Sequence, residues 1–326
     1  MVIFTICSNN YLAQAKILGA SIKKHHRDIK FYIFLCDEKQ EAIDYASLAD
    51  EVIPVSAIEQ QLPELALRYN IIELNTCIKP HAIAYLLNER NIDKVLYLDP
   101  DIKVFAPLHH LFEELNTVSI LLTPHVYTPI PIDGKKPGEN TFLNYGLYNL
   151  GFIGVNKSKE STAMLAWWKE WTYKLGYIAP EKGIFVDQLP INHVPIFFSN
   201  VKILQDYGLN MAPWNIHERY LSEQAGKYYV NDTETLKFYH FSSFKIDTME
   251  LPLVHYDRFT MAERPDLEGI HKEYNEELKA ARHDFYQQFT SSYSITREAY
   301  LIEQEQEAYP IKQEKKLLNR LLKKFF

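Results

Sequence analysis

Apolar residues gather in short runs along the first hundred residues of the chain. Residues 2–7 (VIFTIC), 30–35 (KFYIFL) and 94–98 (KVLYL) are almost entirely apolar, and residues 51–55 form a shorter run. Uninterrupted runs of this length are typical of strands that are buried on both faces of a sheet. The pattern therefore predicts four strands of an internal sheet.

Segments with helical spacing separate these runs. Residues 11–24 carry apolar side chains three or four positions apart, at Leu12, Ala15, Leu18 and Ile22. Residues 74–90 also have a helical pattern, with Pro80 expected in the first turn or at a kink. The alternation of strand and helix predicts an α/β fold, Rossmann-like, with a mostly parallel sheet flanked by helices. Ligands of such sheets bind beyond the carboxyl ends of the strands, where residues 8–10 and 99–101 are expected.

The alternation stops after residue 123. Residues 124–144 are rich in proline and glycine, which predicts a long loop of the kind that often binds or covers ligands. The next expected elements are a strand, a helix capped by Ser158 and two short strands, at 147–156, 158–175, 201–204 and 236–241. From residue 261 the pattern is polar and mostly helical. We expect a globular α/β domain at residues 1–260 and a helical C-terminal extension at residues 261–326.

Composition and charge narrow the class of protein. Hydrophobic residues make up 47% and charged residues 24%, which supports a packed core rather than a disordered chain. The formal net charge of −7 does not favour a nucleic-acid partner. Cys7, Cys36 and Cys77 show no metal-binding spacing and form no disulfide framework, so we expect buried thiols and a cytoplasmic location. We expect neither a signal peptide nor a membrane-spanning helix.

The sharpest chemical feature is Asp99-Pro100-Asp101, which follows the run at 94–98. Two carboxylates two residues apart at the end of a strand can reach one divalent cation, and Pro100 fixes the backbone between them. The same tripeptide is also common in ordinary turns at strand ends. The tripeptide alone leaves both interpretations open.

Four segments occur in a fixed order: IFTICSNNY at residues 3–11, KVLYLDPD at 94–101, Asp187-Gln188, and His240-Phe241-Ser242. Together they resemble the GT-A glycosyltransferases, in particular family 8 and its bacterial relatives. The resemblance covers roughly residues 2–245. It implies a GT-A catalytic domain that binds Mn²⁺ or Mg²⁺ and a nucleotide sugar, most readily a UDP-sugar.

The resemblance also implies roles for individual residues. The metal ligands would be Asp99, Asp101 and His240. The nucleotide and diphosphate would contact Thr5, Cys7, Ser8, Asn10, Tyr11, Lys79, Pro100 and Lys245, and the sugar would meet Asn149, while Asp187 and Gln188 would lie at the reacting face. Taken alone, several of these residues have ordinary interpretations: Asn9-Asn10 as a turn, Lys79 as an exposed lysine, and Asp187 as a helix cap.

The chain departs from the family pattern at three places. Ser8 stands where an acidic residue is frequent, and Leu150 stands where a small residue is usual. Residues 240–245 (HFSSFK) contain no glycine, although the family usually has one between the histidine and the lysine. The geometry of this last loop is therefore an open question for the structure.

Two regions outside the motifs suggest partners. Trp214, followed by His217, Glu218 and Arg219, lies in a loop that could contact an acceptor sugar. Residues 311–326 alternate lysine or arginine with leucine and phenylalanine, which is the pattern of a helix at the surface of an anionic membrane. A solvated helix or an oligomer contact is the alternative. We expect the acceptor to be a glycan or a lipid-linked molecule. We also expect the protein to contact the inner face of the membrane peripherally.

The resemblance implies a metal-dependent, retaining hexosyltransferase, for which we expect UDP-glucose or UDP-galactose as the donor. A sugar nucleotidyltransferase shares the sheet and the metal, but it usually opens with a glycine-rich loop, and residues 6–10 (ICSNN) contain no glycine. A non-catalytic sugar-binding protein of the same fold is the third alternative. The sequence does not identify the acceptor or the oligomeric state.

Overall fold

The computed structural model describes residues 1–248, 250 and 256–304. A seven-stranded sheet forms the centre, in the order β10-β6-β7-β4-β1-β2-β3. Its strands are β1 (Val2–Cys7), β2 (Lys30–Leu35), β3 (Glu51–Pro54), β4 (Lys94–Leu98), β6 (Ile120–Pro124), β7 (Tyr148–Asn156) and β10 (Val201–Ile203). All of them run in the same direction except β7, which is antiparallel to both β4 and β6. The predicted α/β fold with a mostly parallel sheet is confirmed.

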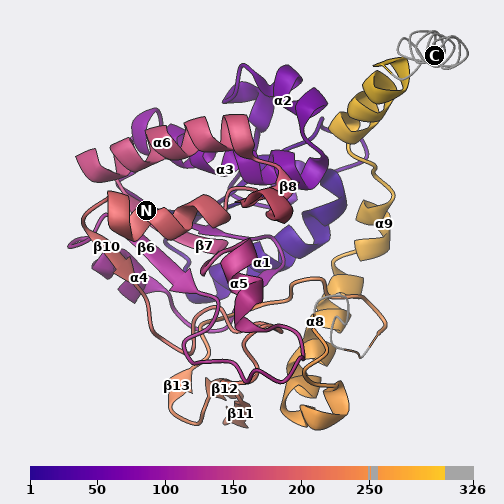
Figure 1. Ribbon diagram of the computed structural model, residues 1–326. Helices are drawn as coiled ribbons and strands as arrows, with labels where there is room; N and C mark the ends of the chain where they lie inside the picture. The colour runs from indigo at the N-terminus through magenta and orange to yellow at the C-terminus, as the bar shows by residue number, and fades with distance from the viewer. Residues whose placement is uncertain (249, 251–255, 305–326) are drawn as a thin grey trace, which may run out of the picture.

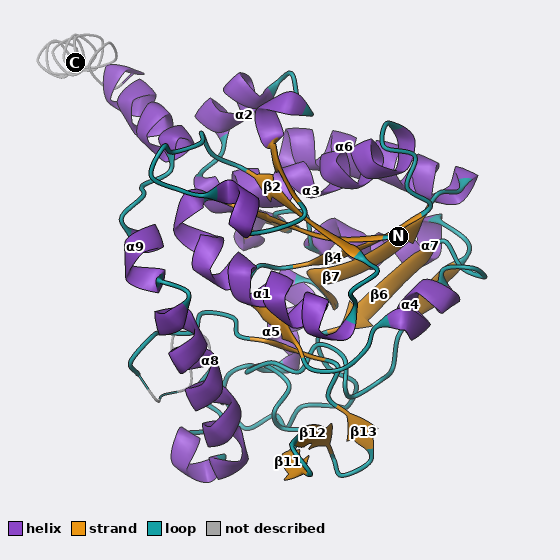
Figure 2. Ribbon diagram, turned by 180° about the vertical axis from the view of Figure 1, so that it is seen from behind, coloured by secondary structure: helices purple, strands orange, loops and turns teal. Residues whose placement is uncertain are grey.

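Helices cover both faces of this sheet (Figures 1 and 2). They are α1 (Leu12–His25), α2 (Leu62–Arg68), α3 (Ile71–Asn88), α4 (His109–Glu114), α5 (Glu139–Tyr145), α6 (Lys159–Leu175), α7 (Val194–Phe197), α8 (Glu268–Ala280) and α9 (His283–Gln287). Alternate residues of β1 face opposite cores: Ile3 packs with α1, α4 and α8, and Phe4 packs with α2, α3 and α6. This alternation explains why the run at 2–7 contains no polar face.

Short ladders lie beside the main sheet. Strand β5 (Ile102–Val104) pairs with β14 (Phe238–His240), and β8 (Ile178–Ala179) pairs with β9 (Ile184–Phe185). Strands β11 (Leu221–Gln224), β12 (Lys227–Val230) and β13 (Glu234–Thr235) form a third ladder. Ala225 and Gly226 join β11 to β12 with φ of 51° and 73°, the left-handed pair of a tight hairpin turn.

The predicted helix boundaries need two corrections. Helix α3 begins at Ile71 rather than at residue 74, because Asn70 accepts hydrogen bonds from the N–H groups of Ile72 and Glu73 while the Glu73 side chain returns to Asn70 N. Pro80 lies in the interior of α3, not in its first turn. The segment 124–144 is not entirely a loop, because α5 begins at Glu139.

Other expectations for the fold are confirmed. Ser158 caps α6 by accepting a hydrogen bond from Ser161 N at 3.1 Å. The three cysteines are free and buried. Within the described residues, no helix is both long enough and apolar enough to cross a membrane.

The described part of the C-terminal region ends at residue 304. Residues 261–304 are mostly helical as expected, and α8 packs in the same core as α1. The division of the chain at residue 260 stays a prediction. The basic amphipathic segment at residues 311–326 lies outside the described residues.

Candidate active site

The structure brings Asp99, Asp101 and His240 together at the carboxyl end of β4. Strand β5 begins immediately after Asp101, and the pairing of β5 with β14 places Ile102 opposite His240. The His240 Nε2 atom lies 3.0 Å from Asp101 Oδ1 and 3.7 Å from Asp99 Oδ2. One ligand atom from each residue lies within 4.8 Å of the others. Residues separated by 139 positions (101 to 240) thus converge because two short strands pair.

These three side chains fit a divalent cation. Two carboxylates and one imidazole form the mixed oxygen and nitrogen set that Mn²⁺ accepts, and Mg²⁺ binds through carboxylates. Burial lowers the pKa of His240, but Asp101 and then Asp99 outweigh burial, so the pKa lies above its ordinary value. The Tyr97 hydroxyl donates a hydrogen bond to Asp99 Oδ1, which fixes the orientation of that carboxylate.

Gly151 on β7 makes room for His240. A Cβ atom at position 151 would lie 2.5 Å from His240 Cε1 and 2.7 Å from both His240 Nδ1 and Asn149 Oδ1. The backbone of Gly151 also accepts a hydrogen bond from Asp99 N at 2.8 Å. The glycine in the predicted Asn149-Leu150-Gly151 motif is therefore required by the close approach of a candidate metal ligand.

The amide side chains of Asn149 and Gln188 form the next part of the site. Gln188 accepts a hydrogen bond from Leu150 N at 2.9 Å and donates one to Tyr145 O at 2.7 Å. Asn149 Oδ1 accepts hydrogen bonds from Gly151 N at 3.2 Å and from Asn210 Nδ2 at 3.1 Å. The structure thus places Asn149 and Gln188 together, each held by the backbone of β7 or of its flanking loops.

Lys79 and Asp187 are also adjacent. Lys79 Nζ lies 2.7 Å from Asp187 Oδ2 and donates a hydrogen bond to Leu150 O at 2.7 Å. Both side chains are buried, and Lys79 lies over the ring of Tyr97. Burial raises the pKa of Asp187, and the charge of Lys79 opposes this effect. Lys79 is therefore not the exposed lysine of the ordinary interpretation, and the residue at the N-cap of the following helical turn is Gln188 rather than Asp187.

The candidate nucleotide residues lie at the end of β1. Thr5, Cys7 and Ser8 are buried, and Ser8 Oγ donates to Cys36 O at 3.3 Å. Asn10 and Tyr11 belong to a 3₁₀ turn, η1 (Asn9–Tyr11), that leads into α1. Tyr11 is 43% exposed. Burial, followed by the charges of Asp101 and Asp99, raises its pKa.

Lys245 is exposed and lies five residues after His240. Between them, Ser243 has a φ of 58°, in the left-handed region that favours glycine. In this chain a serine therefore adopts the left-handed backbone conformation that a glycine adopts without strain. The predicted phosphate contact of Lys245 stays a prediction.

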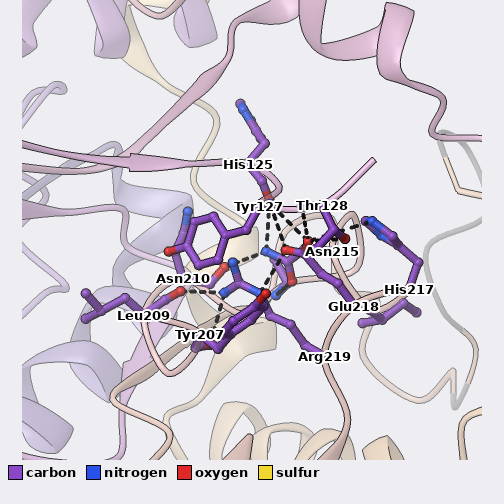
Figure 3. A network of polar contacts seen from close by, with 12 residues as sticks. His125, Tyr127, Thr128, Tyr207, Leu209, Asn210, Asn215, His217, Glu218 and Arg219 are labelled. Carbon is purple, nitrogen blue, oxygen red and sulfur yellow. Dashed lines mark hydrogen bonds and ion pairs between the residues drawn. The ribbon is translucent and has the colours of Figure 1, made fainter. Parts of the chain in front are cut away.

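Figure 3 shows a polar network that adjoins Asn149 and that the sequence did not predict. Glu218 accepts hydrogen bonds from Tyr127 N and from the N–H and hydroxyl of Thr128. Arg219 donates to the carbonyl oxygens of Leu209 and Tyr207. These bonds tie the segments around residues 127 and 209 together, so Glu218 and Arg219 have a structural role that charge alone did not indicate.

The network continues to the candidate site through two asparagines. Asn215 Nδ2 donates to His125 O at 3.1 Å and to Asn210 O at 2.9 Å. Asn210 then donates to Asn149. Both asparagines are fully buried, which is unusual without partners, but no spacing in the sequence distinguishes them from surface asparagines.

Trp214 lies where the sequence did not place it. Trp214 is only 4% exposed and packs edge-on against His240 and His125, at 5.1 and 5.4 Å between ring centroids. It is a wall beside the candidate metal ligand and not an open platform for a sugar. On α6, Trp168 is fully buried and donates a hydrogen bond to Asp187 O, and Trp167 is partly buried against the same core.

A second cluster of possible metal ligands contains His26, Asp28 and His109. His26 Nε2 accepts a hydrogen bond from Leu108 N at 2.8 Å, and His26 Nδ1 lies 3.4 Å from His109 Nε2. The neutral ring that accepts at Nε2 carries its proton on Nδ1. Because Nδ1 then has no lone pair for a cation, this cluster is a hydrogen-bonded histidine pair.

Comparisons with known proteins complete the description. No family model matches the chain. The uncharacterized protein YfnF of Bacillus subtilis (strain 168) is 29% identical over 280 residues, covering 84% of this chain and 90% of YfnF. Among solved structures, galactosyltransferase LgtC with donor and acceptor sugar analogues matches with 14% identity and a TM-score of 0.49, covering 86% of this chain and 96% of LgtC. Glycosyltransferase GlyE of Streptococcus pneumoniae TIGR4 matches with 16% identity and a TM-score of 0.48, covering 87% of this chain and 64% of GlyE.

Proposed function

We propose that the protein is a metal-dependent glycosyltransferase that transfers a hexose from a nucleotide sugar. The observation that carries this proposal is the convergence of Asp99, Asp101 and His240 at the carboxyl end of β4. The predicted sugar-binding residues Asn149, Asp187 and Gln188 lie on the strand and loop beside them. Three motifs that are far apart in the sequence thus meet at one edge of the sheet, where α/β proteins bind their ligands.

The residues of this chain have distinct roles in the proposed reaction. Asp99, Asp101 and His240 would hold Mn²⁺ or Mg²⁺, which when bound would neutralise the charge of the departing diphosphate. Tyr11 would stack on the base, because its ring is partly exposed in the turn that follows β1. Gln188 would present its side-chain oxygen to the sugar from a fixed position, since its amide already bonds to the backbone at Tyr145 and Leu150.

The finer assignments follow from the sequence resemblance. We propose UDP-glucose or UDP-galactose as the donor, retention of the anomeric configuration, and a glycan or lipid-linked acceptor. A cytoplasmic location with peripheral contact at the membrane through residues 311–326 belongs to the same proposal. Retention would proceed without a carboxylate nucleophile, the departing phosphate taking the proton of the acceptor hydroxyl as that hydroxyl attacks.

Two other functions would use the same fold. A sugar nucleotidyltransferase would need a triphosphate-binding loop, but η1 after β1 is Asn9-Asn10-Tyr11 and has no glycine. A non-catalytic binding protein would need no charged pair such as Lys79 and Asp187 inside the site, because burying two charges costs free energy that simple packing avoids. Both observations favour the transferase.

A thermal-shift screen tests the proposal. The purified protein is heated with each of a set of UDP-, GDP- and ADP-sugars, with and without Mn²⁺. We expect a UDP-hexose with Mn²⁺ to raise the melting temperature, because a ligand that binds only the folded state stabilises it. The stabilising donor is then assayed for metal-dependent hydrolysis or transfer. Absence of stabilisation by every nucleotide sugar would contradict the proposal, and binding without turnover would favour the non-catalytic alternative.

A further inference from the structure

A buried carboxylate links three segments that are distant in the sequence. Asp37 follows β2 and is 1% exposed. Its Oδ1 atom accepts hydrogen bonds from Ser292 N at 2.9 Å, Ser292 Oγ at 2.6 Å and Glu38 N at 2.9 Å. Its Oδ2 atom accepts one from Asn9 N at 3.3 Å. Asp37 therefore connects the turn η1 at the candidate nucleotide site to the C-terminal extension.

The contacts of Asp37 explain how a carboxylate can be buried there. Residues 292–304 are helical, so Ser292 supplies Asp37 with an N–H group from the first turn of a helix. N–H groups at the start of a helix are free of internal partners and carry partial positive charge, which stabilises a carboxylate. Hydrogen bonds to a charged acceptor are also stronger than neutral ones. Loss of the helix start would leave Asp37 with too few donors.

Further contacts join the same segments. Gln287 Nε2, on α9, donates to Asn10 O at 2.8 Å. The Tyr293 hydroxyl donates to Glu38 Oε1 at 3.1 Å. Asn9 donates to Glu38 O and accepts a hydrogen bond from the Tyr45 hydroxyl. The turn η1 is thus held on one side by the loop after β2 and on the other by the C-terminal helices.

The extension also packs beside the candidate metal site. Tyr274 of α8 stacks on Phe241 with a centroid separation of 3.8 Å and an interplanar angle of 6°. Phe241 follows His240 directly, and its N–H donates to Asp101 O at 2.9 Å. Figures 1 and 2 show α8, α9 and the final helix along one side of the molecule, beside α1. The extension therefore supports both the nucleotide turn and the strand that carries His240.

We propose that the C-terminal extension forms a wall of the donor-nucleotide site and that Asp37 is the positioning residue through which it fixes η1. This inference rests on the proposed function, because it assumes that a nucleotide binds at η1. It assigns a purpose within the donor site to residues 283–304, which the sequence motifs did not reach. Asp37 would set the affinity for the nucleotide without contacting it.

Substitutions at each end of the link test the inference. In Asp37→Asn, the new NH₂ group faces the N–H donor of either Asn9 or Ser292, so η1 loses its anchor. Ser292→Ala removes one hydroxyl donor and keeps the backbone bond. Ser292→Thr retains the hydroxyl, and Thr296→Ala is the matched control, because Thr296 lies on the same helix and its hydroxyl bonds to the carbonyl of Ser292 rather than to Asp37.

Two measurements are made on the full-length protein. Calorimetric titration with UDP and Mn²⁺ gives the dissociation constant, and hydrogen exchange follows the amides of residues 8–11 without nucleotide. We expect the dissociation constant to rise about tenfold in Asp37→Asn and about threefold in Ser292→Ala, as the loss of charge-assisted hydrogen bonds implies. Exchange at residues 8–11 should accelerate in both variants, while Ser292→Thr and Thr296→Ala match the wild type and the affinity for Mn²⁺ alone stays unchanged.

The outcomes separate the two proposals. A wild-type protein that binds no nucleotide would overturn the proposed function. A wild-type protein that binds UDP, with Asp37→Asn and Ser292→Ala binding equally well and showing normal exchange at residues 8–11, would overturn the positioning role. If Asp37→Asn proves unfolded by circular dichroism, the comparison of Ser292→Ala with Ser292→Thr decides, because the two differ at the hydroxyl donor.

Discussion

Lys79 and Asp187 form an ion pair inside the protein, with Lys79 Nζ 2.7 Å from Asp187 Oδ2 and both side chains at most 3% exposed. The sequence motifs assign these residues to two separate contacts, one with phosphate and one with sugar. Their pairing makes them a single unit that spans from α3 to the loop before Gln188. Substrate would therefore meet a paired carboxylate at this position rather than a free one.

The ion pair predicts a strong effect of removing one partner. Lys79→Met should lower the free energy of unfolding by about 3–5 kcal/mol, because it leaves a buried carboxylate without a counter-charge. Adding Asp187→Asn to Lys79→Met should recover part of this loss, with a coupling of about 1–3 kcal/mol. Urea unfolding of the wild type, both single variants and the double variant measures the coupling, and strictly additive losses would contradict the pairing.

Asp101 should be essential for metal-dependent activity. Asp101→Asn keeps the shape of the side chain and removes the charge that lies nearest His240. We expect the affinity for Mn²⁺ and kcat/KM for the donor to fall at least about a hundredfold, since metal chemistry contributes several kcal/mol to such reactions. Glu170→Gln is the control, because its carboxylate is exposed on α6 and pairs with Lys174 outside the candidate site. An Asp101→Asn enzyme with normal activity and metal dependence would show that the site is wrongly assigned.

Gly151→Ala should disturb the metal site without changing a ligand. The added methyl group would press on His240 and Asn149, so one of them must move. We expect a loss of stability of about 1–3 kcal/mol, typical of overpacking, together with weaker Mn²⁺ binding.

The control for this substitution lies on the same strand. The three atoms nearest to a Cβ atom at Gly154 would belong to Leu121 and Leu96, at 3.0 to 3.1 Å. Gly154→Ala should therefore also lose stability but keep its affinity for Mn²⁺. Equal Mn²⁺ affinities in the two variants, measured by titration, would mean that His240 does not depend on Gly151.

The pH dependence of stability should reflect buried histidines. Burial, followed by the neighbouring His109, lowers the pKa of His26 to about 4, below the ordinary value of about 6.5. The unfolded state then binds more protons between these values, so the stabilising contribution is complete above pH 6.5 and decreases as the pH falls toward 4. Thermal melts from pH 7.5 to 4.5 should show a shallower decline for His26→Gln than for the wild type.

The control for the pH experiment is the exposed residue His193. His193→Gln should follow the wild-type decline at every pH. A His26→Gln protein with the same slope as the wild type would assign the acid sensitivity to other groups, such as His271, whose pKa burial lowers to about 4.

The sequence predicts the centre of this fold better than its periphery. The strands at 2–7, 30–35 and 94–98 were recognisable because burial on both faces leaves them almost entirely apolar. The start of α3 was missed because its signal is a capping box at Asn70 and Glu73, outside the apolar pattern. The strands β11 to β13 have mixed polarity and are only two to four residues long, so periodicity does not reveal them.

Some residues of the candidate site could likewise be predicted from the sequence, and others could not. Asp99, Asp101 and His240 could be proposed because their residue types and order match a known family, and the structure brings them together. The role of Asp37 could not be proposed, because it depends on Ser292, more than 250 residues later. Likewise, Trp214 looked suited to a sugar in the sequence, and only its burial beside His240 shows what it contacts.

The pairing of β5 with β14 determines the spacing between the candidate metal ligands Asp101 and His240. Residues 102–104 bond to residues 238–240 in one register, and successive side chains of a strand face opposite sides. A single inserted residue in either strand would turn the imidazole of His240 away from Asp101. This register does not depend on the length of the exposed loops between the two strands, so such loops can change while the ligands stay in place. Under the proposed function, changes in these loops would alter acceptor recognition while the candidate metal ligands stay the same.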